Sequence, residues 1–420
     1  MPRQHGLLKS VAAQSTNIQT DFPHPIAAPS AMLMKSSDSI DVSFSLPLVQ
    51  RLRFTADIFG DDAQVLLELL EPSGDAPARV QFWIDLDVAS SNDNLKETIF
   101  GLMKSNADQV TLTDPPQTIV GGEACKNDPA IIDRLLQAFN DADLDRRSYV
   151  VVVGGGAVLD AVGFAASIAH RGIRLVRIPT TTLAQADSGI GVKNAVNWFG
   201  KKNWKGTFAV PWGVINDSAI LESLPDREYR CGFSEVVKVS LLKRPDVFDS
   251  VDRNATKIRR RDPEASAAAI RDSVTMHLDH ITRGGDPFET LEARPLDFGH
   301  WSAHRLEAIT NYEVRHGEAV AIGLAIDCLY AKRVLGLPAA QCERIIGCLQ
   351  RLGLPVRHDA IADADALLSG LEEFRQHLGG RLTITLIQAI GSPVNVHQID
   401  NVAMREAIDE AGSLKSLPVL

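Results

Sequence analysis

The chain lacks the patterns that mark several protein classes. Its five cysteines form no C-x-x-C pair, and an odd number of scattered cysteines is typical of reduced thiols in a cytoplasmic protein. It has no run of 18 apolar residues, which argues against a transmembrane helix. It also lacks an excess of basic residues, because its net charge is −10 and its pI is near 5.6. We therefore expect a cytoplasmic protein with neither a nucleic-acid nor a membrane partner, since nucleic-acid binders usually carry a basic face.

The composition is that of an ordinary globular protein. The 420 residues are 45% hydrophobic and 23% charged, which is enough for two or three packed domains. Residues 1–40 differ, because they contain proline, serine and glutamine, few acids and no apolar core of a secretory signal. We interpret them as a flexible N-terminal tail, with a transit peptide as the alternative.

Strands alternate with helices as far as about residue 220. Strand-like alternation is visible in 39–59, and 80–89 reads as a buried strand that ends in two acids. An amphipathic helix is expected in 128–144, with an aspartate as its N-cap. Residues 148–172 read as an apolar strand, three glycines and a helix. This alternation predicts a parallel sheet with helices on both faces.

After about residue 220 the apolar residues follow helical spacing, apart from one late strand at 381–391. The predicted fold class is therefore an α/β nucleotide-binding domain, residues 41–220, followed by a mostly α-helical domain, residues 221–420. We expect a cleft between the two domains.

The glycine-rich sequence VVVVGGGAVLDAVG, residues 150–163, follows the predicted strand. Backbone amides and a helix N-terminus at such a turn attract a pyrophosphate, and glycines let the ligand approach closely. The spacing is not G-x-G-x-x-G, so a tight strand–helix turn without a ligand stays the alternative. The two acidic residues near the end of FWIDLDVA would suit a ribose, because a carboxylate there can accept hydrogen bonds from the ribose hydroxyls.

Two histidines, His300 and His304, lie four residues apart in a helix-compatible sequence and would share a helix face. They could form a metal site, a substrate site or an ordinary helix surface. Further candidates are His316 and Glu235, the latter three residues before Lys238. A catalytic zinc ion usually has three protein ligands and an open position. A lone histidine is more often structural, so the metal hypothesis depends on the combination.

Four segments, taken in order, together resemble the sugar phosphate cyclase superfamily, whose best-known member is 3-dehydroquinate synthase. The segments are GGGAVLDAVG through to DSAILESLP, FSEVVK, LDFGHWSAH and RHGEAVAIGLA. The resemblance covers roughly residues 50 to 395. It implies a Rossmann-like N-terminal domain, a helical C-terminal domain, a homodimer, bound NAD, and a zinc or cobalt ion.

The resemblance also implies roles for the residues that match family motifs. The implied metal ligands are Glu235, His300 and His316. The implied cofactor contacts are Asp85, Glu123, Lys126, Gly154, Gly155, Gly156, Asp160, Thr180 and Thr181. The implied catalytic residues are Asp187, Lys193, Lys238, Glu289 and His304. The implied substrate contacts are Lys202, Asn203, Asp297, His377 and, reaching into the site of the other subunit, Arg171.

Members of the superfamily use NAD to oxidise a ring hydroxyl transiently, with the metal as a Lewis acid. The resulting ketone acidifies a neighbouring C–H, phosphate leaves by β-elimination, and the hydride returns. Ring opening and an aldol closure then give a carbocycle. A phosphorylated sugar substrate requires donors and cations around its phosphate, a role that the resemblance gives to Lys193, Asn203, His304 and Arg171.

The sequence departs from 3-dehydroquinate synthase at the substrate pocket. That enzyme acts on a carboxylated substrate. In its R-x-x-x-N-F-G-H motif, this chain has Ala293 at the arginine position and Asp297 at the asparagine position. His377 lies near the position of a later lysine. Aspartate would repel a carboxylate, although a register shift to Arg294 could restore a cation. LDFGH and FR-x-HLGG-x-L-x-ITL look like sedoheptulose 7-phosphate cyclases such as 2-epi-5-epi-valiolone synthase, but these have proline where this chain has His304.

The chain is also similar to the divergent cyclases of ebo-type gene clusters. The lysine expected about twenty residues before Gly299–His300 is missing, and Asp279 or His280 occupies that region. The leading prediction is a cyclase for a phosphorylated ketose, with sedoheptulose 7-phosphate preferred. The alternatives are 3-dehydroquinate synthase, a metal-dependent alcohol dehydrogenase of related fold with NAD as co-substrate, and a non-catalytic binding protein.

Overall fold

The computed structural model describes residues 40–284, 288, 296–377 and 381–415. The chain divides into two units, Met1–Pro47 and Leu48–Leu420. The predicted N-terminal tail, residues 1–40, lies almost wholly outside the described residues. Residues 40–47 contain no helix or strand, and their side chains are exposed.

Strand-like alternation in 39–59 overestimates the strand, because among the described residues of this segment only Leu52–Thr55 form one, β1. These residues pair with one strand, β9, and the chain turns immediately afterwards. The turn is stabilised by Asp62, whose carboxylate accepts a hydrogen bond from the Ala56 amide at 2.7 Å. A strand needs a neighbour for its backbone groups, and sequence alternation does not reveal where that neighbour ends.

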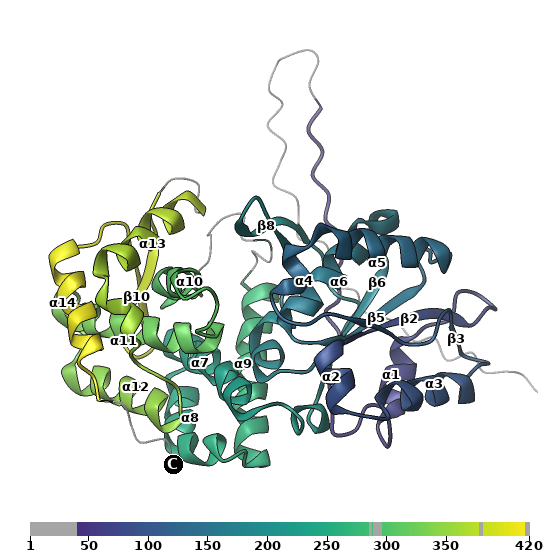
Figure 1. The fold of residues 1–420 in the computed structure, drawn as a ribbon, viewed down its shortest axis with the longest axis horizontal. Helices are drawn as coiled ribbons and strands as arrows, with labels where there is room; N and C mark the ends of the chain where they lie inside the picture. Colours follow the sequence, from purple (N-terminus) through teal and green to yellow (C-terminus); the bar gives the residue numbers. More distant parts are fainter. Residues whose placement is uncertain (1–39, 285–287, 289–295, 378–380, 416–420) are drawn as a thin grey trace, which may run out of the picture. The chain divides into compact units, whose positions relative to one another are not determined.

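The α/β part of the second unit is built on a parallel sheet, as predicted (Figure 1). Its strands follow the order β1-β9-β6-β5-β2-β3, and β4 also pairs with β2. Their bounds are β2, Ala78–Asp85; β3, Val110–Leu112; β4, Gln117–Ile119; β5, Tyr149–Gly154; β6, Arg174–Pro179; and β9, Gly213–Asp217. Strand β2 ends four residues before the predicted end at residue 89, because Asp85 is the N-cap of α2, Leu86–Ser91.

Helices cover both faces of this sheet. The α5–α6 face contains Val150 and Val152 of β5, and the α1–α3 face contains Val151 and Val153. All residues of β5 are buried because successive side chains point to opposite, equally covered faces. The helices on these faces are α1, Ala63–Leu69; α3, Leu95–Ser105; α5, Pro129–Asp141; and α6, Gly156–Ile168. Asp128 caps α5 by accepting from the Ala130 amide at 2.9 Å, which confirms the predicted aspartate cap.

Between β6 and β9 lie η2, a short π-helix at Ala184–Ser188, and an antiparallel hairpin that was not predicted. The hairpin consists of β7, Lys193–Trp198, and β8, Lys201–Phe208. Phe199 and Gly200 form its turn, and both have positive φ, 53° and 69°. Two residues with positive φ match the twist of a hairpin, but phenylalanine rarely adopts positive φ, so residue preferences do not predict this turn.

The helical part begins with α7, and its apolar residues form one large cluster. Helix α11 lies at its centre, where Gly317 and Ala319–Ala331 are all buried. The described helices are α7, Asp226–Lys243; α8, Pro245–Arg259; α9, Pro263–Thr282; α10, His300–Ile309; α11, His316–Val334; α12, Ala339–Arg351; α13, Ala364–His377; and α14, Asn401–Gly412. The late strand is a hairpin, β10, Ile384–Ala389, with β11, Ser392–Val396.

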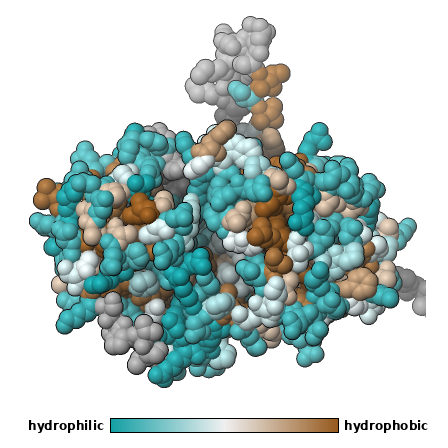
Figure 2. Space-filling view, in the orientation of Figure 1, coloured by the Kyte–Doolittle hydropathy of each residue, from teal (hydrophilic) through white to brown (hydrophobic). Residues whose placement is uncertain are grey.

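These elements confirm the predicted fold class, an α/β domain followed by a mostly helical one. The exact division at residue 220 stays a prediction. All five cysteines are buried and unpaired. Among the described helices, none has the length and apolarity to cross a membrane. The face in Figure 2 is hollowed between the α/β and helical parts, and hydrophilic residues predominate around the hollow.

Candidate metal and cofactor site

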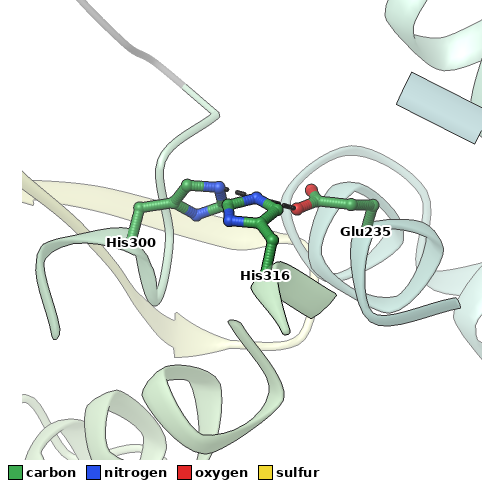
Figure 3. A group of neighbouring side chains, drawn as sticks. All are labelled: Glu235, His300 and His316. Carbon is green, nitrogen blue, oxygen red and sulfur yellow. Dashed lines mark ion pairs between the residues drawn. The ribbon is translucent and has the colours of Figure 1, made fainter. Parts of the chain in front are cut away.

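Three side chains from separate helices converge at one point of the helical part (Figure 3). Glu235 lies within α7, while His300 and His316 are the first residues of α10 and α11. Both imidazoles direct Nε2 toward the same carboxylate oxygen, Glu235 Oε1, at 3.6 Å for His300 and 3.4 Å for His316. The structure thus brings together the three residues that the sequence predicted as metal ligands.

Close helix packing positions these ligands. A Cβ atom on Gly317, the residue after His316, would lie 2.2 Å from the backbone oxygen of Cys231 in α7. A Cβ atom on Gly323 would lie 2.0 Å from the oxygen of Gly299, just before His300. Only glycine permits these approaches, so α11 can contact both α7 and the start of α10.

The chemistry of the three donors fits a zinc or cobalt ion. Among the described residues, neither oxygen of buried Glu235 accepts a hydrogen bond of ordinary geometry, although Lys238 Nζ lies 2.5 Å from Oε2. His300 Nδ1 lies 3.1 Å from the Phe298 carbonyl, and His316 Nδ1 lies 3.1 Å from Glu307 Oε2. These acceptors favour the proton on Nδ1, which leaves each Nε2 lone pair for a metal.

The charges around the triad are balanced. Burial alone would raise the pKa of Glu235, but Lys238 and the two imidazoles lower it below its ordinary value. Burial alone would lower the pKa of His316, but the Glu307 and Glu235 carboxylates raise it to about 9, so a metal ion at Nε2 would replace a proton there. Burial and Lys238 together lower the pKa of His300. A buried carboxylate that stays charged is a suitable metal ligand.

Glu307 is a site residue that sequence reasoning missed. It follows His304 by three residues and His300 by seven, so helical spacing could have placed it on the same face. Its oxygens contact both sides of the site: Oε2 contacts His316 Nδ1, and Oε1 accepts from Lys202 Nζ at 2.9 Å. His304, Glu307 and His316 form a second group with metal-ligand spacing. Since the oxygens of Glu307 already contact Lys202 and His316, we assign Glu307 to orienting His316 and not to binding a metal ion.

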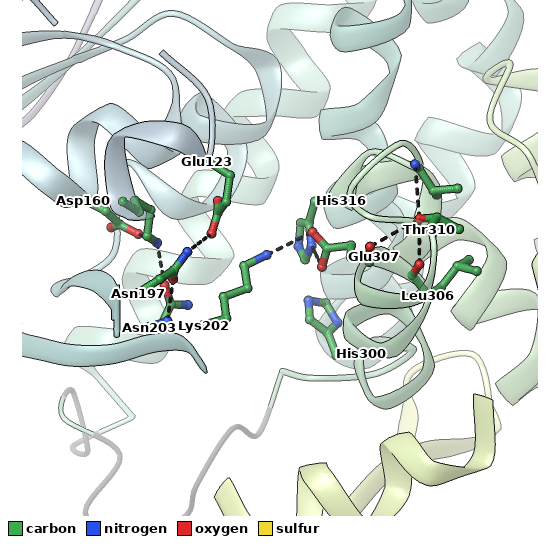
Figure 4. A network of polar contacts seen from close by, with 12 residues as sticks. Glu123, Asp160, Asn197, Lys202, Asn203, His300, Leu306, Glu307, Thr310 and His316 are labelled. Atoms are coloured by element: carbon green, nitrogen blue, oxygen red, sulfur yellow. Dashed lines mark hydrogen bonds and ion pairs between the residues drawn. The ribbon is translucent and has the colours of Figure 1, made fainter. Parts of the chain in front are cut away.

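Lys202 and Asn203 connect the hairpin to two different neighbours (Figure 4). Lys202 reaches from β8 to Glu307 on α10. Burial alone would lower the pKa of Lys202, but Glu307 raises it. Asn203 Oδ1 accepts from Lys126 Nζ at 2.5 Å, and the same ammonium lies 2.7 Å from Asp160 Oδ2. The Lys202 ammonium therefore links the α/β part to the metal triad through Glu307.

Asn197, another missed residue, completes the polar network of the hairpin. Its Oδ1 accepts from the Asn203 amide at 2.8 Å, and its Nδ2 donates to Glu123 Oε1 at 2.8 Å. These contacts join the predicted cofactor residues Glu123, Lys126 and Asp160 to the hairpin. The sequence implied that each would contact NAD, and their partners became visible only with the hairpin.

The glycine turn after β5 leads into the start of α6, where helix amides can bind an anion. The N-cap of α6 is Gly155, which has no side chain to cap the helix; among the described residues no side chain caps the amides that follow, although the Gly155 amide contacts the Asp85 carboxylate. A Cβ atom on Gly154 would lie 2.8 Å from Val158, and one on Gly156 would lie 2.7 Å from Ser188 Oγ. This cradle fits a pyrophosphate, and Ser188 Oγ is itself buried and unpaired among the described residues.

Asp85 and the two predicted threonines lie at the ends of neighbouring strands. Asp85 ends β2, and burial raises its pKa although the Asp87 amide donates to it. Thr180 follows β6, and its amide donates to the Gly154 carbonyl at 3.0 Å. Thr181 Oγ1 accepts from the Ala184 amide at 3.1 Å. These positions suit a dinucleotide at the carboxyl ends of the strands.

Asp187 lies in η2 and has a partner that sequence reasoning missed. His277 Nδ1, on α9, lies 2.7 Å from Asp187 Oδ1. Burial alone would raise the pKa of Asp187, but Lys238 and His277 keep it below its ordinary value. Asp279, considered for the position of a family lysine, instead pairs with Arg283 at 3.2 Å, away from Asp187. Thus His277, rather than Asp279, pairs with Asp187, while the other residue considered for this position, His280, stays a prediction.

The remaining predicted residues have mixed outcomes. His304 shares α10 with His300, their rings 5.5 Å apart, and burial and His300 keep its pKa well below the ordinary value. Asp297 precedes α10; burial alone would lower the pKa of Lys238, but Glu235, Asp187 and, to a smaller extent, Asp297 raise it. Lys193 begins β7 and is exposed. Glu289 and the side chain of His377 lie outside the described residues.

Arg171 is not brought to the metal triad of its own chain. It follows α6, which starts at the cofactor turn and is about 20 Å long at 1.5 Å per residue. Its side chain is exposed and lines a cavity of about 350 Å³ together with Ser167, Thr207 and Trp212. Its predicted role in the site of the partner subunit stays a prediction.

Two family models match adjoining segments of the chain. The model for the N-terminal part of 3-dehydroquinate synthase matches residues 117–231, and the model for its C-terminal part matches residues 232–375. The 3-dehydroquinate synthase of Halorhodospira halophila is 35% identical over 280 residues, which are 66% of this chain and 78% of that protein. The 2-epi-5-epi-valiolone synthase of Streptomyces glaucescens is 33% identical over 297 residues, which are 70% of this chain and 76% of that protein.

A solved structure with NAD⁺ and Zn²⁺ bound is also similar. It is the 2-epi-5-epi-valiolone synthase ValA of Streptomyces hygroscopicus subsp. jinggangensis, with a TM-score of 0.79 and 26% identity over 89% of this chain and 99% of that chain.

Proposed function

Because this chain belongs to the sugar phosphate cyclase superfamily, we propose that it converts a phosphorylated ketose into a carbocycle with loss of phosphate, using NAD and a zinc or cobalt ion. Sedoheptulose 7-phosphate is the preferred substrate, and the enzyme would be a carbon–oxygen lyase. The observation that carries the proposal is the buried triad, in which two Nε2 atoms face one carboxylate oxygen of Glu235.

When bound, NAD supplies a hydride acceptor and the metal ion supplies a Lewis acid. Glu235, His300 and His316 would hold the metal. The amides at the start of α6 would bind the pyrophosphate of NAD, and Asp85 would accept hydrogen bonds from the adenosine ribose. The Lys126–Asp160 ion pair, at 2.7 Å, would hold Asp160 beside this cofactor site.

The other residues would bind and orient the sugar phosphate. Lys238 and Asp187 offer a donor and an acceptor next to the triad, a pairing that suits ring hydroxyls. Lys193, Asn203 and neutral His304 would donate hydrogen bonds to the phosphate. Arg171 of the partner subunit would complete this set in a homodimer. Glu289 and His377 stay predicted substrate-site residues.

Asp297 favours the ketose over a carboxylated substrate. Asp297 lies three residues before His300, and its charge partly offsets the lowering of the His300 pKa by burial and Lys238, which supports a position near the triad. A substrate carboxylate at this position would meet a like charge, whereas a hydroxyl could donate to Asp297. The identities to 3-dehydroquinate synthase and valiolone synthase, 35% and 33%, do not separate the two activities. 3-Dehydroquinate synthase is therefore the second candidate.

A direct assay separates these functions. Purified protein, NAD and Zn²⁺ or Co²⁺ are mixed with sedoheptulose 7-phosphate or with a carboxylated heptulosonate phosphate, and released phosphate and NADH are measured. Phosphate release from the first substrate without net NADH supports the proposal. Release only from the second would assign 3-dehydroquinate synthase activity, and stoichiometric NADH would indicate an alcohol dehydrogenase. Light scattering would measure whether the protein is a dimer. Mixing an inactive Arg171 variant with an inactive Glu235 variant would test the shared site, because the mixture recovers activity only if Arg171 of one subunit serves the site of the other.

A further inference from the structure

A histidine–carboxylate pair lies beside the proposed substrate site, where the superfamily pattern led us to expect a lysine. His277 Nδ1 and Asp187 Oδ1 form an ion pair at 2.7 Å, a separation at which a charge-assisted hydrogen bond can form. The two side chains retain 16% and 28% of their exposure, so they are accessible to a small molecule. The pair is therefore neither a core contact nor a solvated surface ion pair.

Both partners are held by elements with little freedom to move. On α9, Ser273 lies one turn before His277, and its hydroxyl donates to the Ala186 carbonyl at 3.0 Å, next to Asp187. On the other side of η2, the Arg177 guanidinium donates to the carbonyls of Gly189 and Gly191 at 3.0 and 2.8 Å. These contacts fix the distance between α9 and η2 without using either member of the pair.

Helical spacing explains why His277 faces Asp187. Ser266, Ile270, Ser273 and His277 form one stripe along α9, and the first three are buried. Asp279 is on a different face, and its side chain is 46% exposed beside Arg283. The stripe places His277, rather than Asp279, against Asp187.

Electrostatics determine which atom carries the proton. Lys238 and His277 keep the pKa of Asp187 below its ordinary value despite burial, so the carboxylate accepts hydrogen bonds and does not donate. The Nδ1 atom of His277 must then carry hydrogen. Nε2 has no hydrogen-bond partner among the described residues, and a Cβ atom on Gly191 would lie 3.9 Å from it.

We propose that His277 is a positioning residue for Asp187. Its Nδ1–H holds Oδ1, so that the other carboxylate oxygen stays available to a ring hydroxyl of the sugar beside Lys238. This inference rests on the proposed cyclase function for its kinetic consequence, but the hydrogen bond itself does not depend on turnover.

The test compares four proteins with NAD and metal bound: wild type, His277→Ala, His277→Asn and the control Thr275→Ala. Asparagine can place its Nδ2 amide where Nδ1–H lies, and Thr275 is on the exposed face of the same helix. Loss of a hydrogen bond to a charged group predicts that His277→Ala lowers kcat/KM by about 10- to 100-fold, with metal content and NAD affinity unchanged. His277→Asn should recover most of this loss, and Thr275→Ala should resemble wild type.

Nitrogen NMR of ¹⁵N-histidine-labelled protein gives a readout without turnover. The signal missing from His277→Asn identifies His277, which should be the Nδ1–H tautomer in wild type and should change in Asp187→Asn. An Nε2–H tautomer, an unaffected His277→Ala, or an asparagine variant as impaired as the alanine variant would overturn the proposal. If wild type releases no phosphate from any sugar phosphate but keeps the Nδ1–H tautomer, the proposed function fails while the hydrogen bond stands.

Discussion

The two sides of the candidate site differ in construction. The metal side consists of Glu235 within α7 and of His300 and His316 at the starts of two packed helices, and Glu235 is only 1% exposed. The hairpin side, Lys202 and Asn203 on β8, belongs to a strand whose residues are mostly exposed. Two polar contacts, Lys202 with Glu307 and Asn203 with Lys126, hold it to its neighbours. We infer that the metal side is rigid before any ligand binds, whereas the hairpin side relies on a few long side chains.

The largest expected effect is the loss of metal binding and turnover when a ligand on the metal side is removed. Glu235→Ala should abolish both bound metal and phosphate release, because it removes one of three ligands and leaves buried Lys238 without its closest carboxylate. Leaving one partner of a buried pair uncompensated also costs about 3–5 kcal/mol of stability. Elemental analysis, turnover and urea unfolding measure the three quantities. Glu222→Ala, at an exposed glutamate, is the control, and a Glu235→Ala protein that keeps its metal would contradict the ligand assignment.

Asp327 is a buried residue whose hydrogen bonds hold the start of α10 on the metal side. It is fully buried on α11, and its carboxylate accepts from Trp301 Nε1 at 2.8 Å and from the Gly299 amide at 2.9 Å, on either side of His300. Burial raises its pKa to about 7. The folded state therefore binds more protons than the unfolded state between about pH 4 and pH 7, so stability should fall as pH rises through this window.

The comparison with Asp327→Asn isolates this titration. The wild type should lose roughly 3 kcal/mol of unfolding free energy relative to the variant between pH 4 and pH 7, at up to about 1.4 kcal/mol per pH unit. Urea unfolding at several pH values in the presence of a chelator measures the difference. Parallel pH profiles for the two proteins would show that Asp327 is ionised throughout.

Glu307 lies between the two sides and should affect the metal more than the hairpin. Glu307→Gln keeps the shape but weakens the acceptor for His316 Nδ1, and loss of such an orienting partner typically lowers metal affinity by about 10- to 100-fold. Competition with a zinc chelator measures the affinity. Glu313→Gln, at an exposed glutamate after the same helix, should leave it unchanged. Equal affinities for all three proteins would show that Glu307 serves the hairpin alone.

Asp297 sharpens the choice of substrate. Asp297→Asn removes the like charge that would face a substrate carboxylate, so the ratio of kcat/KM for heptulosonate phosphate over heptulose phosphate should rise by roughly tenfold, about 1.4 kcal/mol. Asp279→Asn, on the outer face of α9, should leave the ratio as it is. A ratio that falls in Asp297→Asn would mean that Asp297 does not face the part of the substrate that distinguishes the two sugars.

The metal side was predictable from sequence, and much of the hairpin side was not. His300, His316 and Glu235 each lie in a distinctive motif, and glycines such as Gly317 mark the close approaches that bring them together. The hairpin depends on a positive φ at Phe199, which residue preferences disfavour. His277 and Glu307 contact partners 90 and 105 residues away, at Asp187 and Lys202, so only packing reveals them.

The smallest expected effect concerns the hairpin side itself. Lys202→Met keeps the length of the side chain but removes its ion pair with Glu307, a partly exposed contact worth about 1 kcal/mol. Since Glu307 still holds His316, metal affinity should stay within about twofold, whereas KM for the sugar phosphate should rise by about three- to fivefold. Lys201→Met, at the exposed neighbouring lysine, is the matched control for charge. If Lys202→Met instead weakens metal binding as much as Glu307→Gln, the two sides form one unit, because the hairpin then also determines the position of His316.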